Sequence, residues 1–212
     1  MAHPAVNKWH RRDFLGAAAL VALYFGLPET ALSLDTLPND KAPTKRQRQL
    51  MRIVSDLVLP RTDTPGAGEV GTGDFVLLAL AHGLGGSDAA IPAALRSTLA
   101  PGIVPHLKSD GALRHADWLE AELDRRAGGD FQAAAKPHDL VAALDADAYA
   151  KGMDGHPWRT IKTLVLTGYY TSEVGASQEL RFELVPGRWD PDLPVTAQTR
   201  AFSSDWTAVD FG

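Results

Sequence analysis

The sequence predicts a mainly α protein: a small helical domain of five to six helices, followed by an irregular C-terminal arm containing at most a short strand or hairpin. Apolar residues recur three and four positions apart through much of residues 44–171, which is the period of helices packed on a core. Prolines and glycines interrupt this pattern where helices begin and end. Beyond Thr171 the period disappears. The hydrophobic fraction of 45% is enough for one core.

The first helix is marked at both ends. Thr44 and Gln47 have the spacing of a capping box, in which each side chain bonds the backbone N–H of the other residue. Pro60 has no backbone N–H to donate, so it ends the helix. The apolar stripe between these signals consists of Leu50, Ile53, Val54, Leu57 and Val58.

Further regions carry helical signals. We expect helices over residues 74–82, near 88–99, over 110–127, and from Pro137 and Pro157 onward. A proline fits the first turn of a helix, because the N–H that it lacks would have no partner there. Gly128 and Gly129 end the helix over residues 110–127.

The C-terminal arm lacks helical periodicity and holds three prolines. Residues 180–185 alternate apolar and polar side chains, which predicts one short strand. A tail of this length without periodicity is unusual inside a compact domain, and such tails often wrap a partner. We therefore divide the chain into a leader (1–33), a linker (34–43), a helical domain (44–171) and an extended arm (172–212).

Residues 1–33 have the features of an export leader. A basic start is followed by an apolar run over residues 14–27, and Pro28 ends that run. Residues 31–33 then form an Ala-Leu-Ser site of the small-x-small kind that signal peptidase cleaves. The apolar run is too short to span a bilayer comfortably, which favours cleavage. An uncleaved membrane anchor on a scaffold protein is the alternative.

The leader contains a twin-arginine (Tat) motif. Two consecutive arginines precede x-Phe-Leu in that motif, and the matching residues here are Arg11, Arg12, Phe14 and Leu15. His10 stands where Ser or Thr usually precedes the pair, and an ordinary Sec leader with a chance arginine pair is the alternative. The motif predicts that the Tat translocase, which carries folded proteins, exports the chain to the periplasm.

Composition excludes several kinds of chemistry. The chain has no cysteine, so it cannot attach a c-type haem, ligate an iron–sulfur cluster through thiolates, use a thiol nucleophile or form a disulfide. Its net charge is -5, and beyond the leader the basic residues cluster only at Lys45, Arg46 and Arg48. A nucleic-acid surface needs a broader basic stripe, so we expect no nucleic-acid partner.

A glycine-rich loop is the first candidate for a binding motif. Gly66, Gly68 and Gly71 match Gly-x-Gly-x-x-Gly, but a dinucleotide fingerprint needs a preceding strand within a βαβ unit. A helix precedes this loop instead. We interpret the loop as a turn-rich connector whose glycines adopt positive φ.

Metal and hydrolase motifs are absent from the sequence. The histidines beyond the leader lack metal-ligand spacing: His82, His106, His115, His138 and His156. The carboxylates within residues 120–124 and 145–147 fit solvated helix faces, and there is no Gly-x-Ser-x-Gly elbow. We expect no catalytic, metal-binding or cofactor-binding residue in this chain. A stand-alone exported enzyme of unknown reaction is the alternative.

Aromatic residues and arginine gather near the C-terminus. These residue types anchor protein interfaces, and packing on the helical core explains them equally well. We call Tyr169, Tyr170, Trp189 and Trp206, together with Arg188, the C-terminal aromatic set.

Three blocks of the sequence resemble the gluconate 2-dehydrogenase subunit 3 family. The first is the Tat-like Arg-Arg-Asp-Phe-Leu of the leader, and the second is Thr-Asp-Thr-Pro-Gly-Ala within residues 58–67. The third joins Tyr-Tyr-Thr-Ser-Glu to Val-Pro-Gly-Arg-Trp within residues 166–189. The resemblance spans roughly residues 44–212. Some members have a cysteine after Val-Pro-Gly where this chain has Asp190-Pro191-Asp192, so no thiol-dependent role is implied here.

The resemblance implies a small subunit of a dehydrogenase complex. Its catalytic partner would be an FAD protein of the glucose–methanol–choline (GMC) oxidoreductase type, commonly with a cytochrome c subunit that takes the electrons. That partner typically lacks an export signal and travels with the small subunit. We therefore expect a non-catalytic periplasmic subunit, held at the inner membrane through the complex, that exports and stabilises a sugar or gluconate dehydrogenase. Expected interface residues are Thr62, Asp63 and Pro65, together with the C-terminal aromatic set.

Overall fold

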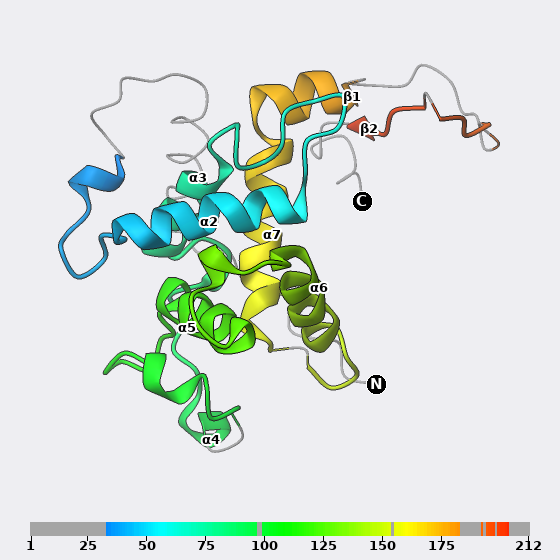
Figure 1. Ribbon diagram of the computed structural model, residues 1–212. Helices are drawn as coiled ribbons and strands as arrows, with labels where there is room; N and C mark the ends of the chain where they lie inside the picture. Colours follow the sequence, from blue (N-terminus) through cyan, green and yellow to red (C-terminus); the bar gives the residue numbers. More distant parts are fainter. Residues whose placement is uncertain are drawn as a thin grey trace, which may run out of the picture.

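The computed structural model describes residues 33–96, 99–153, 155–182, 192, 194–197 and 199–203. Within this part of the chain the mainly α prediction is confirmed, since six α-helices make up most of the regular structure (Figure 1). They are α2 (Lys45–Val58), α3 (Thr72–Ala81), α4 (Ala93–Arg96), α5 (His115–Ala127), α6 (Pro137–Ala148) and α7 (Pro157–Tyr170). The short 3-10 turns are η1 (Leu34–Thr36), η2 (Leu84–Gly86), η3 (Val104–His106) and η4 (Phe131–Ala133), and η5 (Gly175–Glu179) is a π-helical turn.

Helix α7 is the centre of the fold. It contacts α2, α3, α5 and α6, and α2 runs across it in Figure 1. Trp158, Ile161 and Val165 of α7 are fully buried, so the face with apolar residues three and four positions apart is the face that packs inward. A continuous core of apolar side chains joins these helices.

Helix α2 begins as the sequence predicts. The Thr44 hydroxyl accepts from the Gln47 N–H at 3.1 Å, and the Gln47 side chain accepts from the Thr44 N–H at 3.0 Å. The Gln47 amide also donates to Asp117 of α5 at 2.8 Å, so the cap ties α2 to a neighbouring helix. The helix ends at Val58, two residues before Pro60.

Helix α5 starts later than the apolar period suggests. The Lys108 N–H donates to the Ala112 carbonyl at 2.8 Å, and the Asp110 side chain accepts from the Ala112 N–H at 2.8 Å. Gly111 has a φ of +88°, a conformation that favours glycine. The Asp-Gly turn therefore outweighs the apolar period, and the helix begins at His115.

The helix expected near residues 88–99 is also shorter, and the described part of that region keeps only α4. The Ile91 N–H donates to the Gly111 carbonyl at 2.9 Å, which pairs the chain before α4 with the turn. The Arg96 side chain donates back to the Ile91 carbonyl at 2.9 Å. These tertiary bonds occupy backbone groups that a longer helix would have used.

The segments on either side of the helical region pack against it. Residues 33–44 contain η1, and Leu34 is 5% exposed within the core. After α7 the chain forms η5 and then β1 (Arg181–Phe182), which pairs in parallel with β2 (Phe202–Ser203). Of the strand expected over residues 180–185, the structure describes Arg181 and Phe182 as a strand. This strand pairs with a parallel strand, and not with the return strand of a hairpin.

Carboxylates of α5 and α6 take part in ion pairs between elements. Arg46 of α2 donates to Asp124 at 2.8 Å, to Asp130 at 2.8 Å and to Glu120. Asp145 of α6 accepts from two donors on α7. These carboxylates are partly exposed, in line with the expectation of solvated helix faces, and their side chains also join α2 to α5 and α6 to α7.

Acid is expected to destabilise this fold through His115, the first residue of α5. Burial lowers the pKa of His115 from 6.5 to about 4, although a hydrogen bond to the Leu113 carbonyl opposes the shift. The unfolded chain therefore binds this proton first as the pH falls. The stability that depends on neutral His115 is complete above pH 6.5. It is lost progressively down to about pH 4, by about 1–3 kcal/mol in total.

Urea unfolding at pH 7 and at pH 5 measures this loss. The His115→Gln variant should lose about 1–2 kcal/mol less than the wild type between the two conditions, because it has no imidazole to titrate. Equal losses would assign the acid sensitivity to other groups, such as His156, whose pKa burial also lowers.

Candidate functional site

The loop between α2 and α3, residues 59–71, is held at the C-terminal end of α2 by hydrogen bonds from two of its backbone N–H groups, to the Leu59 carbonyl and to the Asp56 side chain. The Ala67 N–H donates to the Leu59 carbonyl at 2.9 Å, and the Gly68 N–H donates to the Asp56 carboxylate at 2.7 Å. Ala67 is completely buried. The loop that carries Thr-Asp-Thr-Pro-Gly-Ala therefore has a fixed shape against the helix.

Two glycines of this loop are needed for close packing. A Cβ added to Gly68 would lie 2.6 Å from Asp56 Cγ and would collide with the Arg52 carbonyl, and one added to Gly66 would lie 2.6 Å from Asp56 Oδ1. Of the three glycines in the motif, only Gly71 has a positive φ, at +82°. The expectation of positive φ is therefore wrong for Gly66 and Gly68. Their small size lets the loop approach α2.

Thr64 joins this loop to the C-terminal end of α7. Its hydroxyl lies 3.1 Å from the Tyr169 hydroxyl and donates to Glu179 of η5 at 2.5 Å. The Tyr169 hydroxyl donates to the Pro65 carbonyl at 3.1 Å. Thr64 and Tyr169 are 7% and 3% exposed, so water cannot readily replace these bonds. We call Thr64, Pro65, Tyr169 and Glu179 the loop–helix cluster.

The two hydroxyls of the loop–helix cluster have two protons for three contacts. A carboxylate is the strongest acceptor present, so Thr64 donates to Glu179. The Tyr169 proton is then shared between the Pro65 carbonyl and the Thr64 oxygen, which can still accept. Both hydroxyl protons are used within the protein, so the cluster fastens the loop to the helix.

A tight turn after α7 places Glu179 beside the loop. The Ser172 hydroxyl accepts from the Gly175 N–H at 3.0 Å, and Ser172 is 2% exposed. A Cβ on Gly175 would lie 2.7 Å from the Tyr169 carbonyl carbon, so glycine is required for this turn to pack on the helix end. π-helical turns are rare and are often found at functional sites. The Tyr-Tyr-Thr-Ser-Glu block thus returns the chain toward the loop.

Tyr170 lies beside the loop–helix cluster. The rings of Tyr169 and Tyr170 meet edge to face, with centroids 5.2 Å apart, a favourable arrangement for aromatic pairs. Burial raises the pKa of Tyr170, and the nearby Glu179 carboxylate raises it further. Tyr170 is therefore a neutral phenol at physiological pH.

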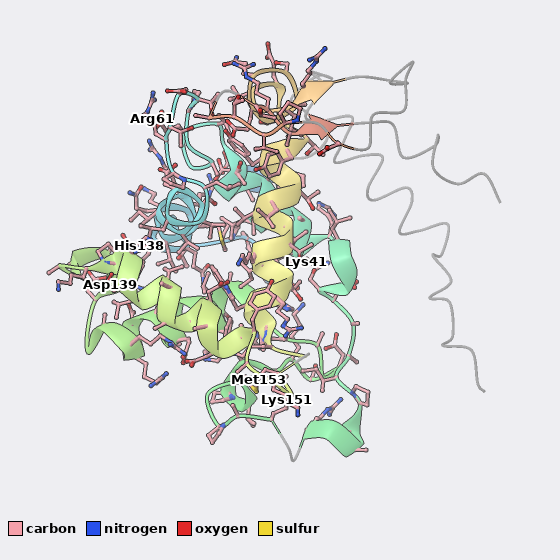
Figure 2. All side chains as sticks on the ribbon, turned by 90° about the vertical axis from the view of Figure 1, so that its right-hand side faces the viewer. Lys41, Arg61, His138, Asp139, Lys151 and Met153 are labelled. Carbon is pink, nitrogen blue, oxygen red and sulfur yellow. The ribbon has the colours of Figure 1, made fainter. Side chains whose placement is uncertain are left out.

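The outer face of the loop carries exposed polar groups. Thr62 and Asp63 are exposed, and Arg61 donates to Glu69 at 2.8 Å. This hydrogen bond lowers the pKa of Glu69. Figure 2 shows Arg61 at the surface, at the end of the molecule where β1 and β2 lie. The loop–helix cluster holds the backbone beneath these side chains, so the loop presents them in one arrangement.

The residues expected at a partner interface have different surroundings. Thr62 and Asp63 are exposed, Pro65 and Tyr170 are half-buried, and Tyr169 is part of the core. Packing on the core, the alternative considered for the aromatic set, thus applies to Tyr169. Expected residues that lie outside the described part of the chain are Arg188, Trp189 and Trp206, and the leader residues Arg11, Arg12, Phe14 and Leu15.

Two members of the loop–helix cluster were missed by the sequence analysis. Thr64 lies inside the recognised block, but the block does not show which of its side chains turns inward. Glu179 lies between recognised segments, and no sequence signal pairs it with a threonine 115 positions earlier. Asp56 was missed for the same reason, since only the folded chain brings it to Gly68.

Removing either hydroxyl of the cluster is expected to destabilise the protein, by unequal amounts. Thr64→Val takes the hydroxyl donor from a half-buried carboxylate, which should lower the free energy of unfolding by about 1–3 kcal/mol. Tyr169→Phe takes a donor from a neutral carbonyl and should cost about 0.5–1.5 kcal/mol. Urea denaturation of both variants and of the double variant measures the coupling. Strictly additive costs would contradict a shared cluster.

The described residues offer no metal site and no membrane span. No group of three or more His, Asp or Glu side chains there could hold a metal ion. In the same part of the chain, no helix is long and apolar enough to cross a membrane. The loop–helix cluster is thus the feature in which the recognised sequence blocks and the structure coincide.

The fold and the site together define a small helical protein in which hydrogen bonds of side chains join two blocks that lie far apart in the sequence. A family model described as gluconate 2-dehydrogenase subunit 3 matches residues 45–187, more than half of the chain. The chain therefore belongs to this family, a family of dehydrogenase subunits, as its sequence blocks indicated. A search of curated proteins and a search of solved structures found no match.

Proposed function

We propose that this chain is the non-catalytic small subunit of a periplasmic, FAD-dependent sugar or gluconate dehydrogenase complex. It supplies the Tat signal and stabilises a catalytic subunit of the GMC type, which holds the FAD, and a cytochrome c subunit takes the electrons. Membership of the subunit family supports a place in a dehydrogenase complex. The twin-arginine leader supports export of a folded assembly.

The observation that carries this proposal is the loop–helix cluster. Two blocks of the family resemblance meet there, and their hydroxyls bond one another and Glu179. A loop with a fixed shape loses little conformational freedom when it binds. Thr62 and Asp63, which are exposed on that loop, are thereby positioned for specific contacts with a partner.

Stabilisation of the partner follows from mass action. A subunit that binds the folded catalytic chain, and not the unfolded one, shifts the folding equilibrium of that chain toward the folded state. A complex assembled before export then needs one leader for both chains. This arrangement explains why a chain whose sequence lacks a cofactor motif would carry a Tat leader, which directs the export of folded proteins.

Affinity purification of a C-terminally tagged protein from periplasm tests the proposal. We expect a larger chain with flavin absorption bands to co-purify and to oxidise a sugar with an artificial electron acceptor. A colourless preparation of this chain alone would contradict an obligate subunit. Activity in that preparation would establish the stand-alone enzyme instead.

Reversing one charge on the loop tests its part in binding. Asp63→Arg should abolish co-purification and leave the thermal unfolding of this chain unchanged, because the side chain is exposed and like-charge contacts at an interface cost several kcal/mol. Asp139→Arg, an exposed charge on α6 away from the loop (Figure 2), is the matched control and should retain the partner. Co-purification with both variants would exclude the loop from the interface.

A further inference from the structure

Residues 33–44, which join the leader to α2, are docked on the helical domain, and we call this segment the strap. Leu34 is 5% exposed and belongs to the core, and Leu37 packs against the same core. Turn η1, at the start of the strap, contacts α3. In Figure 1 the strap leads from η1 into the N-terminal end of α2.

One polar contact closes the first turn of the strap, and two others join the strap to α2 and α3. The Ser33 hydroxyl accepts from the Asp35 N–H at 3.2 Å and closes the first turn. Asp35 pairs with Arg48 of α2 at 2.5 Å. The Lys41 ammonium donates to the Ala81 carbonyl at the C-terminal end of α3 at 3.1 Å, where a cation is favourable. The strap is therefore bonded to two helices as well as packed on the core.

The bond after the small-x-small site is the one between Ser33 and Leu34. A protease binds its substrate as an accessible, extended segment, and cleavage of folded proteins concentrates at exposed loops. Here the residue after the bond has its side chain in the core and starts a 3-10 turn. Cleavage therefore requires η1 to open first, and its rate scales with the small population of the open form.

We propose that the docked strap shields the Ser33–Leu34 bond from signal peptidase, so that the folded protein keeps its leader. This inference rests on the export leader of the proposed function. A Tat substrate meets the peptidase after folding, so the docked form is the one that the enzyme encounters. Burial of Leu34 alone is expected to slow cleavage by about tenfold to a hundredfold.

Cleavage by purified signal peptidase in detergent micelles tests the proposal. The substrates are the full-length folded protein, a synthetic peptide of residues 1–40, and the double variant Leu37→Ser/Arg48→Ala, which loosens the strap without changing the residues at the bond. We expect the peptide and the double variant to be cut at least ten times faster than the wild type. Leu140→Ser, which changes a partly buried leucine of α6, is the control and should be cut as slowly as the wild type.

Two other outcomes would overturn the proposal. If the wild type is cut as fast as the peptide or the double variant, the strap does not shield the bond. If none of the substrates is cut, the sequence rather than the strap protects it. Intact-mass measurement of the protein from both periplasmic and membrane fractions shows directly whether residues 1–33 are retained. Partner co-purification from the same cells is scored separately, so its failure would count against the proposed function and not against the shielded bond.

Discussion

The Gly68→Ala substitution is expected to lower the free energy of unfolding by about 2–4 kcal/mol and to abolish co-purification of the partner. The added methyl group would collide with the Arg52 carbonyl in the middle of α2 and with the Asp56 carboxylate. A helix carbonyl cannot move without breaking the helix, so the loop must move away from α2. That movement breaks the bond from the Gly68 N–H to Asp56 and disturbs Thr64 in the loop–helix cluster.

Urea denaturation and affinity purification measure the two effects of Gly68→Ala together. Gly129→Ala is the matched control, because a methyl group there meets no atom within 4 Å. It should change the free energy of unfolding by less than about 0.5 kcal/mol and retain the partner. A stable Gly68→Ala protein would show that the loop can relax. Retention of the partner by a destabilised variant would place the interface elsewhere.

The Trp158→Ala substitution is expected to cost about 3–5 kcal/mol of stability, the largest effect of any single change considered in this protein. Trp158 is fully buried at the start of α7, where all of its ring contacts would be lost. Its Nε1–H also donates to Asp145 of α6 at 2.7 Å. Burial alone would raise the pKa of Asp145, but hydrogen bonds from Lys162 and Trp158 lower it overall.

Two further substitutions separate the contributions of this tryptophan. Trp158→Phe keeps most of the apolar ring and removes the N–H donor, so it should cost about 1–2 kcal/mol. Tyr149→Ala removes an aromatic ring that is 51% exposed and lies beside Arg159 and Lys162, and it should cost about 0.5–1 kcal/mol. Thermal unfolding ranks the three variants. A Trp158→Ala cost no larger than that of Tyr149→Ala would contradict the central place of α7 in the core.

Local signals in the sequence were sufficient for several helix ends. Thr44 and Gln47 form the expected capping box, and Pro137 and Pro157 occupy the first turns of α6 and α7. These signals act within four residues, so they need no knowledge of the rest of the fold. The pattern failed before α5, where a turn at Gly111 with a tertiary bond to Ile91 outweighed the local apolar period.

The sequence predicted the candidate site only in part. The Thr-Asp-Thr-Pro-Gly-Ala and Tyr-Tyr-Thr-Ser-Glu blocks lie on the two segments that the loop–helix cluster joins. Thr62 and Asp63 are exposed, and their place in an interface stays a prediction. The blocks did not show that Tyr169 is buried or that Thr64 bonds Glu179. Side chains more than a hundred positions apart meet through helix packing, and no local period encodes that meeting.

The sequence by itself determined the mainly α class, the cap of α2, the starts of α6 and α7, and the family, because these depend on short-range spacing and on recognisable blocks. The tertiary structure alone decided that Gly66 and Gly68 are small for packing rather than for positive φ. It also decided that Leu34 is buried and that carboxylates of α5 and α6 pair across helices. Each of these depends on which distant groups occupy the neighbouring space, and only the packed chain fixes that.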